Sequence, residues 1–353
     1  MLALGEGTDV ARPIMLDPRA VGPDETERLR RLGADAGDLS GRGVEAALDL
    51  ASGLALPHPG AGRTRFLWEA LATLGAADLQ VARSVEPHLD ALAILHEAGL
   101  DAPAGSTWGV FAAEGPGVRL RAEVADGGWT LLGTKPWCSL ADRLTHALVT
   151  AWVDDERRGL FAVALADATV DRAPGPWAAR GLTDVVSTPV SFDGTRASPV
   201  GGPGWYLERD GFAWGGIGVA AIWYGAAVAV ADRVRSVASH RRPDDVALLH
   251  LGTIDVALAA ARNALREAAS RVDAGHAAAD AGVALALRTR QAVFDAAETV
   301  LRAADHGLGP GPLVAEPDHA ARVADLHLYL RQHHAERDLV ALGREVADGE
   351  EPW

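Results

Sequence analysis

The chain has almost no lysine and almost no cysteine. Of its 353 residues only Lys135 is a lysine and only Cys138 is a cysteine, and both lie in the stretch GTKPWCSLAD. A single cysteine excludes an internal disulfide framework and a structural zinc site built on cysteine. His327, His333 and His334 do not have the i, i+4 spacing of a helical zinc pair, so we expect no metal.

Positive charge is also scarce. The chain has 33 Lys and Arg against 48 Asp and Glu, a formal net charge of −15, and this excludes the basic face that binds nucleic acid. Residues 1–21 lack the basic start and long apolar core of a signal peptide. The most apolar stretch, Trp214 to Val230, is rich in Gly and Ala, and we expect a buried helix rather than a membrane span of about 20 strongly apolar residues. The sequence therefore favours a cytoplasmic protein that binds neither nucleic acid nor a membrane.

Apolar residues at helical spacing mark the first hundred residues. Between Arg63 and Gly99 they recur every three or four positions, as in Leu89, Leu92 and Leu95. Because proline is tolerated only in the first turn, Pro87 predicts the start of a new helix, and Gly99 predicts its end.

The pattern then changes to strand period. Val118, Leu120, Ala122 and Val124 alternate with charged residues, and Gly127-Gly128 is a hairpin signal. The stretch HALVTAWVDDERRGLFAVALA reads as strand, charged turn and strand, and Asp193-Gly194 predicts a further turn. Short strands at this spacing predict a small antiparallel barrel or sandwich from about Ser106 to Val200.

The helical period returns from Gly211 onward. Leu251, Leu258, Leu265 and Val272 lie seven residues apart, as in the seam of a long bundle helix. Further helices are predicted at Val283–Arg302 and Asp318–Val346, separated by the loop HGLGPGPL. We therefore predict an α+β multidomain chain: a helical domain at 1–104, a β domain at 105–206 and a helical bundle at 207–353. Such long helices predict a dimer or tetramer.

This order, and two phrases within it, resemble the acyl-CoA dehydrogenase superfamily. WTLLGTKPWCSLADRLTHALVTAWV is similar to the middle-domain signature, a strand followed by Gly-x-Lys-x-Trp and then a hydrophobic residue and Ser or Thr. LTDVVSTPVSFDGTRAS is similar to the strand and turn that close the barrel. The resemblance implies an N-terminal helical domain, a middle antiparallel β-barrel and a C-terminal four-helix bundle, with FAD bound between barrel and bundle.

The resemblance also implies flavin contacts. Trp137 would pack on the isoalloxazine, Ser139 would lie near its N5 edge, and Cys138 would contribute from the same segment. Lys135 would position that strand. Taken alone, Trp137 would be read as a core tryptophan.

Three further cofactor-binding segments depart from the pattern of the family. VFAAEGPGVRL stands where a Thr-Glu-Pro-x-x-Gly-Ser segment is usual, so Glu114, Gly115 and Gly117 are candidate contacts in a shifted spacing. In place of the segments that hold the adenine end stand RRPDD, whose Arg241 or Arg242 would face a pyrophosphate, and ADHGLG, which lacks the usual glutamine.

The catalytic carboxylate of the family has no counterpart. One family position falls at about Arg331 and the other at Gly215 or Gly216, and none of these is acidic. Asp325 and Glu336 lie within a turn or two of the first position.

Two histidines resemble those of the flavin monooxygenase branch typified by dibenzothiophene monooxygenase. His88 lies on an apolar helix, and His333 shares a helical stripe with Leu326, Leu330 and Val340. With Ser139 they are the candidate catalytic residues. The alternative for each histidine is an ordinary buried core residue.

These features lead to two hypotheses. The first is an FAD-dependent oxidoreductase that acts on an acyl thioester or another small molecule. Dehydrogenation and oxygenation both stay open, and the missing glutamate favours an oxygenase or hydroxylase. The second is a non-catalytic or half-site subunit of a mixed oligomer, which would explain the altered flavin segment and the missing base. No motif identifies the substrate.

Overall fold

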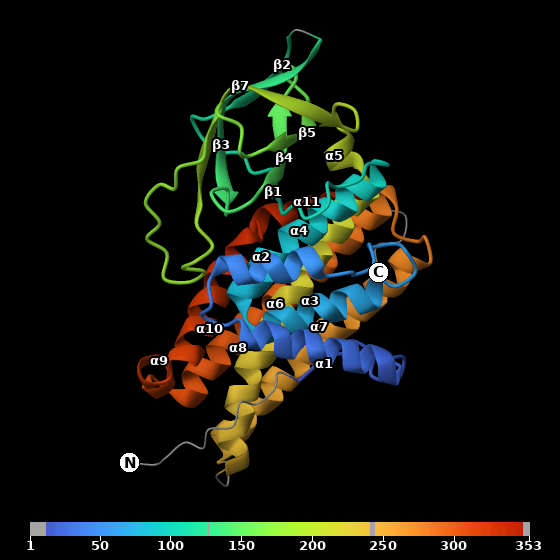
Figure 1. Ribbon diagram of the computed structural model, residues 1–353. Coiled ribbons are helices and arrows are strands. Elements are labelled where there is room, and N and C mark those ends of the chain that lie inside the picture. The colour runs from blue at the N-terminus through green and yellow to red at the C-terminus, as the bar shows by residue number, and fades with distance from the viewer. Residues whose placement is uncertain (1–11, 126, 241–243, 349–353) are drawn as a thin grey trace.

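The computed structural model describes residues 12–125, 127–240 and 244–348, and it places a β-barrel at one end of a stack of helices (Figure 1). The N-terminal helices are α1 (Pro23–Asp38), α2 (Val44–Gly53), α3 (Thr64–Ala77) and α4 (Leu79–Glu97). The strands are β1 (Trp108–Phe111), β2 (Leu120–Ala125), β3 (Gly128–Ser139), β4 (His146–Trp152), β5 (Arg158–Ala164), β6 (Val170–Asp171) and β7 (Ser187–Val200). The later helices are α5 (Trp205–Glu208), α6 (Asp210–His240), α7 (Asp245–Asp273), α8 (Ala279–Leu308), α9 (Gly311–Ala315), α10 (Pro317–Tyr329) and α11 (Glu336–Asp348). The predicted fold class is confirmed.

Helix α4 runs between the barrel and the bundle helices. It begins after Asp78, whose side chain accepts a hydrogen bond from the backbone N–H of Val81 at 2.9 Å. The prediction that Pro87 starts a helix is wrong, because α4 continues through it. Proline has no N–H to offer the carbonyl of Arg83 one turn earlier, but α4 packs on α2, α3, α6 and β1, and this packing outweighs the loss. The predicted end is confirmed, since Gly99 closes the helix with φ 70°.

Five strands form the barrel in the order β4, β5, β7, β3 and β2. Pairing of β2 with β4 closes it. Most pairs are antiparallel, as predicted. The strand periodicity did not reveal that β1 and β2 both run parallel to β4, with Trp108 opposite His146 and Arg121 opposite Trp152. These two strands lie one after the other along the same edge of β4, and alternation within a strand carries no information on its neighbour's direction.

The two glycine turn signals have different outcomes. The Gly127-Gly128 hairpin is confirmed, with Ala125 paired to Gly128. The turn predicted at Asp193-Gly194 is wrong, because β7 runs straight through it. Gly194, at φ 70°, is the extra residue of a β-bulge opposite Leu131 and Leu132. A glycine in the left-handed region serves a tight turn and a bulge equally well, so the sequence signal is the same.

Helix α6 lies at the centre of the helical layers. It is long and apolar enough to cross a membrane, and 67% of its most apolar window is buried inside the structure. This agrees with the predicted buried helix at Trp214–Val230. Beside it, the seam on α7 is buried at Leu265 and Val272 and half-buried at Leu251.

The single helix predicted at Asp318–Val346 is wrong. Helix α10 ends at Tyr329, a 3₁₀ turn covers Leu330–Gln332, and α11 begins at Glu336. The side chain of His333 accepts a hydrogen bond from the backbone N–H of Ala335 at 3.0 Å, and Ala335 has φ 51°. This local turn breaks a pattern that looks continuous in the sequence.

Helices α3 and α6 touch backbone to backbone through glycine. A Cβ on Gly225 would stand 1.8 Å from the carbonyl oxygen of Ala72, and a Cβ on Gly75 would stand 2.4 Å from that of Ile222. Any side chain at either position would therefore force the helices apart.

We expect Gly225→Ala to lower the free energy of unfolding by about 2–3 kcal/mol, the upper part of the range for overpacked cores. Gly252→Ala in α7 is the matched control, because a Cβ there meets nothing within 4 Å. It should be neutral or stabilise by up to about 1 kcal/mol through helix propensity. Urea unfolding of both variants checks this, and equal stability of the two would contradict the close α3–α6 contact.

Candidate active site

The only lysine of the chain joins the two predicted flavin segments. Lys135 on β3 is 1% exposed, and its Nζ lies 2.5 Å from Oε1 of Glu114 and 2.8 Å from Oγ1 of Thr150. Burial lowers the pKa of Lys135, against the effect of Glu114. Burial by itself would raise the pKa of Glu114, but the hydrogen bonds and charge of Lys135, with help from Trp152 and Arg158, hold it below its ordinary value. Lys135 therefore anchors the two segments to each other, and the Glu114 carboxylate is engaged in this ion pair.

The segment after Lys135 bends sharply. Pairing of β3 with β7 shifts register between Lys135 and Cys138, and Trp137 in this bulge has φ 58°. A left-handed conformation is costly for an aromatic residue, and such strain gathers at functional sites. The bulge turns the Trp137 side chain outward, 60% exposed, while Cys138 is buried with its Sγ donating to the carbonyl of Lys135 at 3.3 Å. Burial raises the pKa of Cys138 to about 12, so its side chain is a core group.

The other predicted segment lies directly beside this bulge. A Cβ on Gly115 would stand 3.2 Å from Cγ of Pro136, and Gly115 forms a bridge with Val118. Gly117 has φ 76°, which explains a glycine in this turn. The structure therefore brings Glu114, Gly115 and Gly117 together with β3. Arg241 and Arg242 lie outside the described residues.

Ser139 connects the end of β3 to helix α4. Its Oγ exchanges a hydrogen bond with Oγ of Ser187 at 2.7 Å and accepts one from Nη2 of Arg83 at 3.2 Å. Nη1 of the same guanidinium lies 3.6 Å from Oε2 of Glu86, one turn further along α4. Arg83 thus bridges the barrel hydroxyl and a carboxylate of the helical part.

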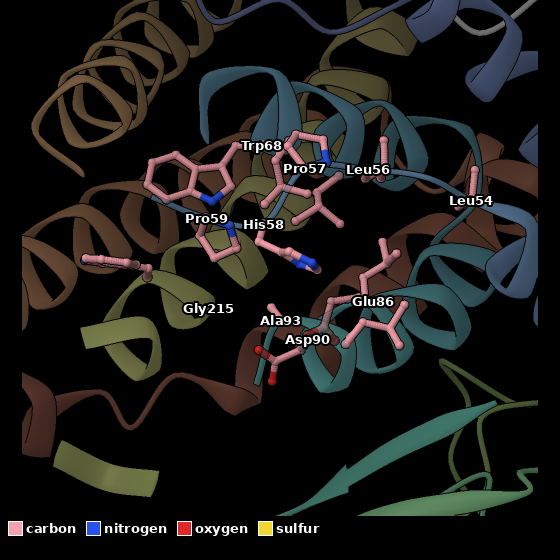
Figure 2. A pocket seen from close by; sticks show the side chains of 16 residues that line it. Leu54, Leu56, Pro57, His58, Pro59, Trp68, Glu86, Asp90, Ala93 and Gly215 are labelled. Atoms are coloured by element: carbon pink, nitrogen blue, oxygen red, sulfur yellow. The ribbon is translucent and has the colours of Figure 1, made fainter. Parts of the chain in front are cut away.

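Glu86 lines a pocket between α4, α6 and the loop after α2. The pocket, together with the open space at its mouth, measures about 560 Å³. Figure 2 shows His58 on the loop, Glu86 and Asp90 on α4, and Gly215 on α6 around it. Most of the wall is apolar, formed by Leu54, Leu56, Pro57, Pro59, Leu67, Trp68, Leu71, Leu89, Leu92, Ala93, Trp214 and Gly218.

The two carboxylates of the pocket lie one turn apart. Burial raises the pKa of Glu86 to about 7; the charges of Arg83 and Arg290 oppose the rise, and Asp90 adds to it. Burial also raises the pKa of Asp90, opposed by Arg209, whose Nη2 is 4.0 Å away. Both groups therefore hold protons at higher pH than ordinary carboxyls do.

His88 belongs to the same helix but not to the pocket lining. It lies two residues from Glu86, which turns it to a different side of α4. His88 is 3% exposed, its Nδ1 has no hydrogen-bond partner among the described residues, and burial lowers its pKa. These are the properties of a buried neutral histidine, and its catalytic role stays a prediction.

His333 lies deeper in the bundle. Its ring stacks on Phe294 with centroids 4.5 Å apart and meets the edge of Trp223. Burial lowers its pKa, against the nearby Asp338. The helical stripe from which we predicted that His333 faces inward also included Val340. For Val340 that prediction is wrong, because its side chain is 53% exposed. The structure does not bring His333 into the pocket with Glu86.

None of the candidate base positions contributes a carboxylate to the lining of the pocket. Arg331 forms an ion pair with Glu298 at the surface. Asp325 is buried and accepts a hydrogen bond from the backbone N–H of Leu182 at 2.5 Å, which ties α10 to the barrel. Glu336 begins α11. At Gly215, however, Oδ1 of Asp90 lies 3.0 Å from the place a Cβ would take.

Sequence reasoning missed Arg83, Glu86 and Asp90. The stretch RSVEPHLD drew attention to His88, although Glu86 and Asp90 in it have the i, i+4 spacing of one helix face. Reading Pro87 as a helix start hid this, because it put Glu86 outside the helix that carries Asp90.

Comparison with known proteins shows which fold this is. The chain has the acyl-CoA dehydrogenase fold, and residues 202–326 match the family model described as acyl-CoA dehydrogenase, C-terminal domain. The resemblance drawn from the sequence is confirmed. Comparison with curated protein sequences finds no match.

Three solved structures illustrate the range of this fold. Butyryl-CoA dehydrogenase from Megasphaera elsdenii is 16% identical with a TM-score of 0.79, over 93% of this chain and 99% of that one. Nitrososynthase from Micromonospora carbonacea var. africana is 19% identical with a TM-score of 0.76, over 94% and 98%. TdsC from Paenibacillus sp. A11-2, in a complex with FMN and indole, is 18% identical with a TM-score of 0.64, over 79% and 82%. At these identities the similarity shows the fold.

We expect Glu114→Gln to destabilise the protein more than Lys135→Met. The first change leaves a buried ammonium without its counter-charge, and it should cost about 2–3 kcal/mol, below the range for fully buried pairs because 34% of the Glu114 side chain is exposed. The second removes the buried charge itself, leaves Glu114 with Arg158, and should cost about 1 kcal/mol. Urea unfolding at neutral pH measures both, and the double variant should resemble Lys135→Met. The reverse order of the single variants would show that Lys135 is not held as a charged anchor.

Proposed function

We propose that the protein is a flavin-dependent oxidoreductase that acts on a small molecule held between α4 and α6. The observation that carries the proposal is the line from Ser139 through Arg83 to Glu86, which joins the predicted flavin-contacting segment to the pocket. The shared fold supports it, since one similar structure holds FMN and another is a dehydrogenase.

The end of β3 fits a flat ring with polar edges. Trp137 offers an exposed aromatic face, and Ser139 offers a hydroxyl beside it. Behind Ser139, the Arg83 guanidinium donates to its hydroxyl and places a positive charge near this end of the strand. When bound, a flavin supplies an acceptor of electrons from the substrate. We propose FAD, with the backbone of Gly115 and Gly117 beside it and with Arg241 or Arg242 at its pyrophosphate.

The residues around the pocket suit a small, largely apolar substrate. Trp68 and Trp214 with the leucines make most of its wall apolar, and Glu86 and Asp90 are its charged groups. Such a wall would not hold the phosphates of a thioester carrier, so an acyl-CoA would have to place them outside. The absence of a carboxylate at Arg331 and Gly215 supports chemistry other than ordinary acyl-CoA dehydrogenation.

We expect the purified protein to bind one FAD per chain, seen as flavin bands in the visible absorption spectrum. Trp137→Ala should weaken FAD binding roughly tenfold, because it removes an aromatic contact of up to about 1.5 kcal/mol. Leu132→Ala is the matched control, an exposed residue on the same strand, 47% exposed, and should bind as the wild type does. FMN is titrated in parallel to establish which flavin is preferred.

A protein that stays colourless with either flavin would overturn the proposal. It would favour the second hypothesis, a non-catalytic or half-site subunit. Co-purification with a related, flavin-containing chain would then be the result to look for.

Assembly into a dimer or tetramer stays a prediction from the long helices. Val246, Leu249 and Val256 on the first half of α7 are 60%, 65% and 71% exposed, and their spacing puts them on one helix face. We expect light scattering to show an oligomer that Leu249→Glu dissociates, whereas Glu267→Gln, further along α7, leaves it intact. A monomeric wild type would contradict the prediction.

A further inference from the structure

The paired carboxylates of the pocket have no role in the flavin contacts. Glu86 and Asp90 face the cavity from consecutive turns of α4, and their side chains are 13% and 23% exposed. No hydrogen bond within the described residues satisfies the Glu86 carboxylate, since its nearest cation, Nη1 of Arg83, is 3.6 Å away. A half-buried carboxylate that faces an apolar cavity without protein hydrogen-bond donors is unfavourable, and such groups gather at functional sites.

Three helices contribute the titratable groups around Glu86. Arg83 and Asp90 come from α4 itself, Arg290 from α8, and Tyr329 from α10. The α6 side of the pocket carries no charge, as it is formed by Trp214, Gly215 and Gly218. Across the cavity, burial lowers the pKa of His58, so it is uncharged at neutral pH.

A hydroxyl without a partner lies behind Arg83, whose guanidinium carbon is 5.8 Å from the centroid of the Tyr329 ring. Tyr329 is 1% exposed, and its Oη has no hydrogen-bond partner among residues 12–125, 127–240 and 244–348. Burial raises its pKa, and of the charges around it that of Glu86 has the largest effect. A buried hydroxyl without a partner, within electrostatic range of Glu86, marks this part of the structure as one that packing alone does not explain.

Glycine on α6 leaves room for the second carboxylate. Oδ1 of Asp90 lies 3.0 Å from the place of a Cβ on Gly215, so a larger residue there would displace it. Asp90 also has Arg209 at 4.0 Å, and this arginine is held by Glu97 at 2.7 Å. Asp90 is therefore fixed next to Glu86, where its charge favours the protonated form of Glu86.

We propose that Glu86 is the proton acceptor of this pocket, and that its substrate is a neutral, largely apolar molecule with a weakly acidic C–H, N–H or O–H group. The proton moves to a carboxylate oxygen of Glu86, and the bonding electron pair stays on the substrate. The carboxylates of Glu86 and Asp90 repel an anion at close range. Arg83 and Arg290 balance the charge of the two carboxylates, so no net negative charge attracts a cation. Asp90 is a positioning residue that tunes Glu86. The inference rests on the proposed function, because it assigns the proton transfer within the same pocket.

The probe we choose is 5-nitrobenzisoxazole, a flat neutral molecule that needs no oxidant. A base removes its C3 proton, the C–H electrons form the nitrile, and the N–O bond breaks to leave a coloured phenolate. The full-length protein is assayed with and without flavin. The wild-type rate should rise with pH to a plateau with a midpoint near 7, where Glu86 loses its proton.

Glu86→Gln should lower the rate by roughly 10²-fold or more, the contribution of a positioned base. Asp90→Asn should keep the plateau but move the midpoint to lower pH, because it removes a charge that favours protonated Glu86. A purely structural role would not produce that shift. Glu123→Gln, an exposed carboxyl on β2, is the control and should change neither rate nor midpoint.

Stability supplies a second readout for the same variant. The pKa of Glu86 is raised from about 4.5 to about 7 in the folded state, so folding is favoured below pH 4.5 and this advantage is lost as pH rises through 7. Glu86→Gln should therefore raise Tm above pH 7, which also rules out misfolding as the cause of a low rate. An unchanged rate in Glu86→Gln, or a midpoint that Asp90→Asn does not move, overturns the inference. Flavin binding is measured separately, so the two proposals fail by different observations.

Discussion

The contact of Arg83 with Ser139 connects the parts of the site. It is the place where the end of the barrel meets the helix that lines the pocket, and the guanidinium serves both sides at once. One nitrogen donates to the Ser139 hydroxyl, and the other faces Glu86. The guanidinium group is planar and always charged. It therefore fixes the direction of both contacts, which the single ammonium of a lysine would not do. The Trp137 bulge, the pocket and the carboxylates are all arranged around this bridge.

The charged side chains near this junction are handled in two ways. Lys135 and Glu114 satisfy each other within hydrogen-bond distance, so their pair holds two chain segments together. Glu86 and Asp90 have cations nearby but no close hydrogen bonds, and burial raises the pKa of each. A satisfied pair indicates structure, whereas unsatisfied carboxylates beside a cavity indicate chemistry, since the fold gains nothing from leaving them so.

The α4 carboxylates change how the missing base of the family positions is understood. Arg331 is engaged at the surface and Gly215 has no side chain, so neither position supplies a proton acceptor. The space next to Gly215 is nevertheless occupied by the carboxylate of Asp90, which arrives from a different helix. A site can therefore keep a carboxylate in the pocket while losing it from the usual element, because what matters is the position of the group in space.

Local patterns in the sequence determined the element types, the order of helices, barrel and helices, and the family resemblance, because apolar spacing and the GTKPWCS phrase are read within one segment. They also singled out Lys135, Trp137 and Ser139. Tertiary structure decided the rest. Packing carried α4 through Pro87, a bulge replaced the turn at Asp193-Gly194, and a local hydrogen bond at His333 ended a helix whose pattern continues. The pairing of Arg83 with Ser139 joins residues 56 positions apart. The approach of Asp90 to Gly215 joins α4 to α6. Such contacts depend on how whole elements pack, and no local pattern encodes that packing.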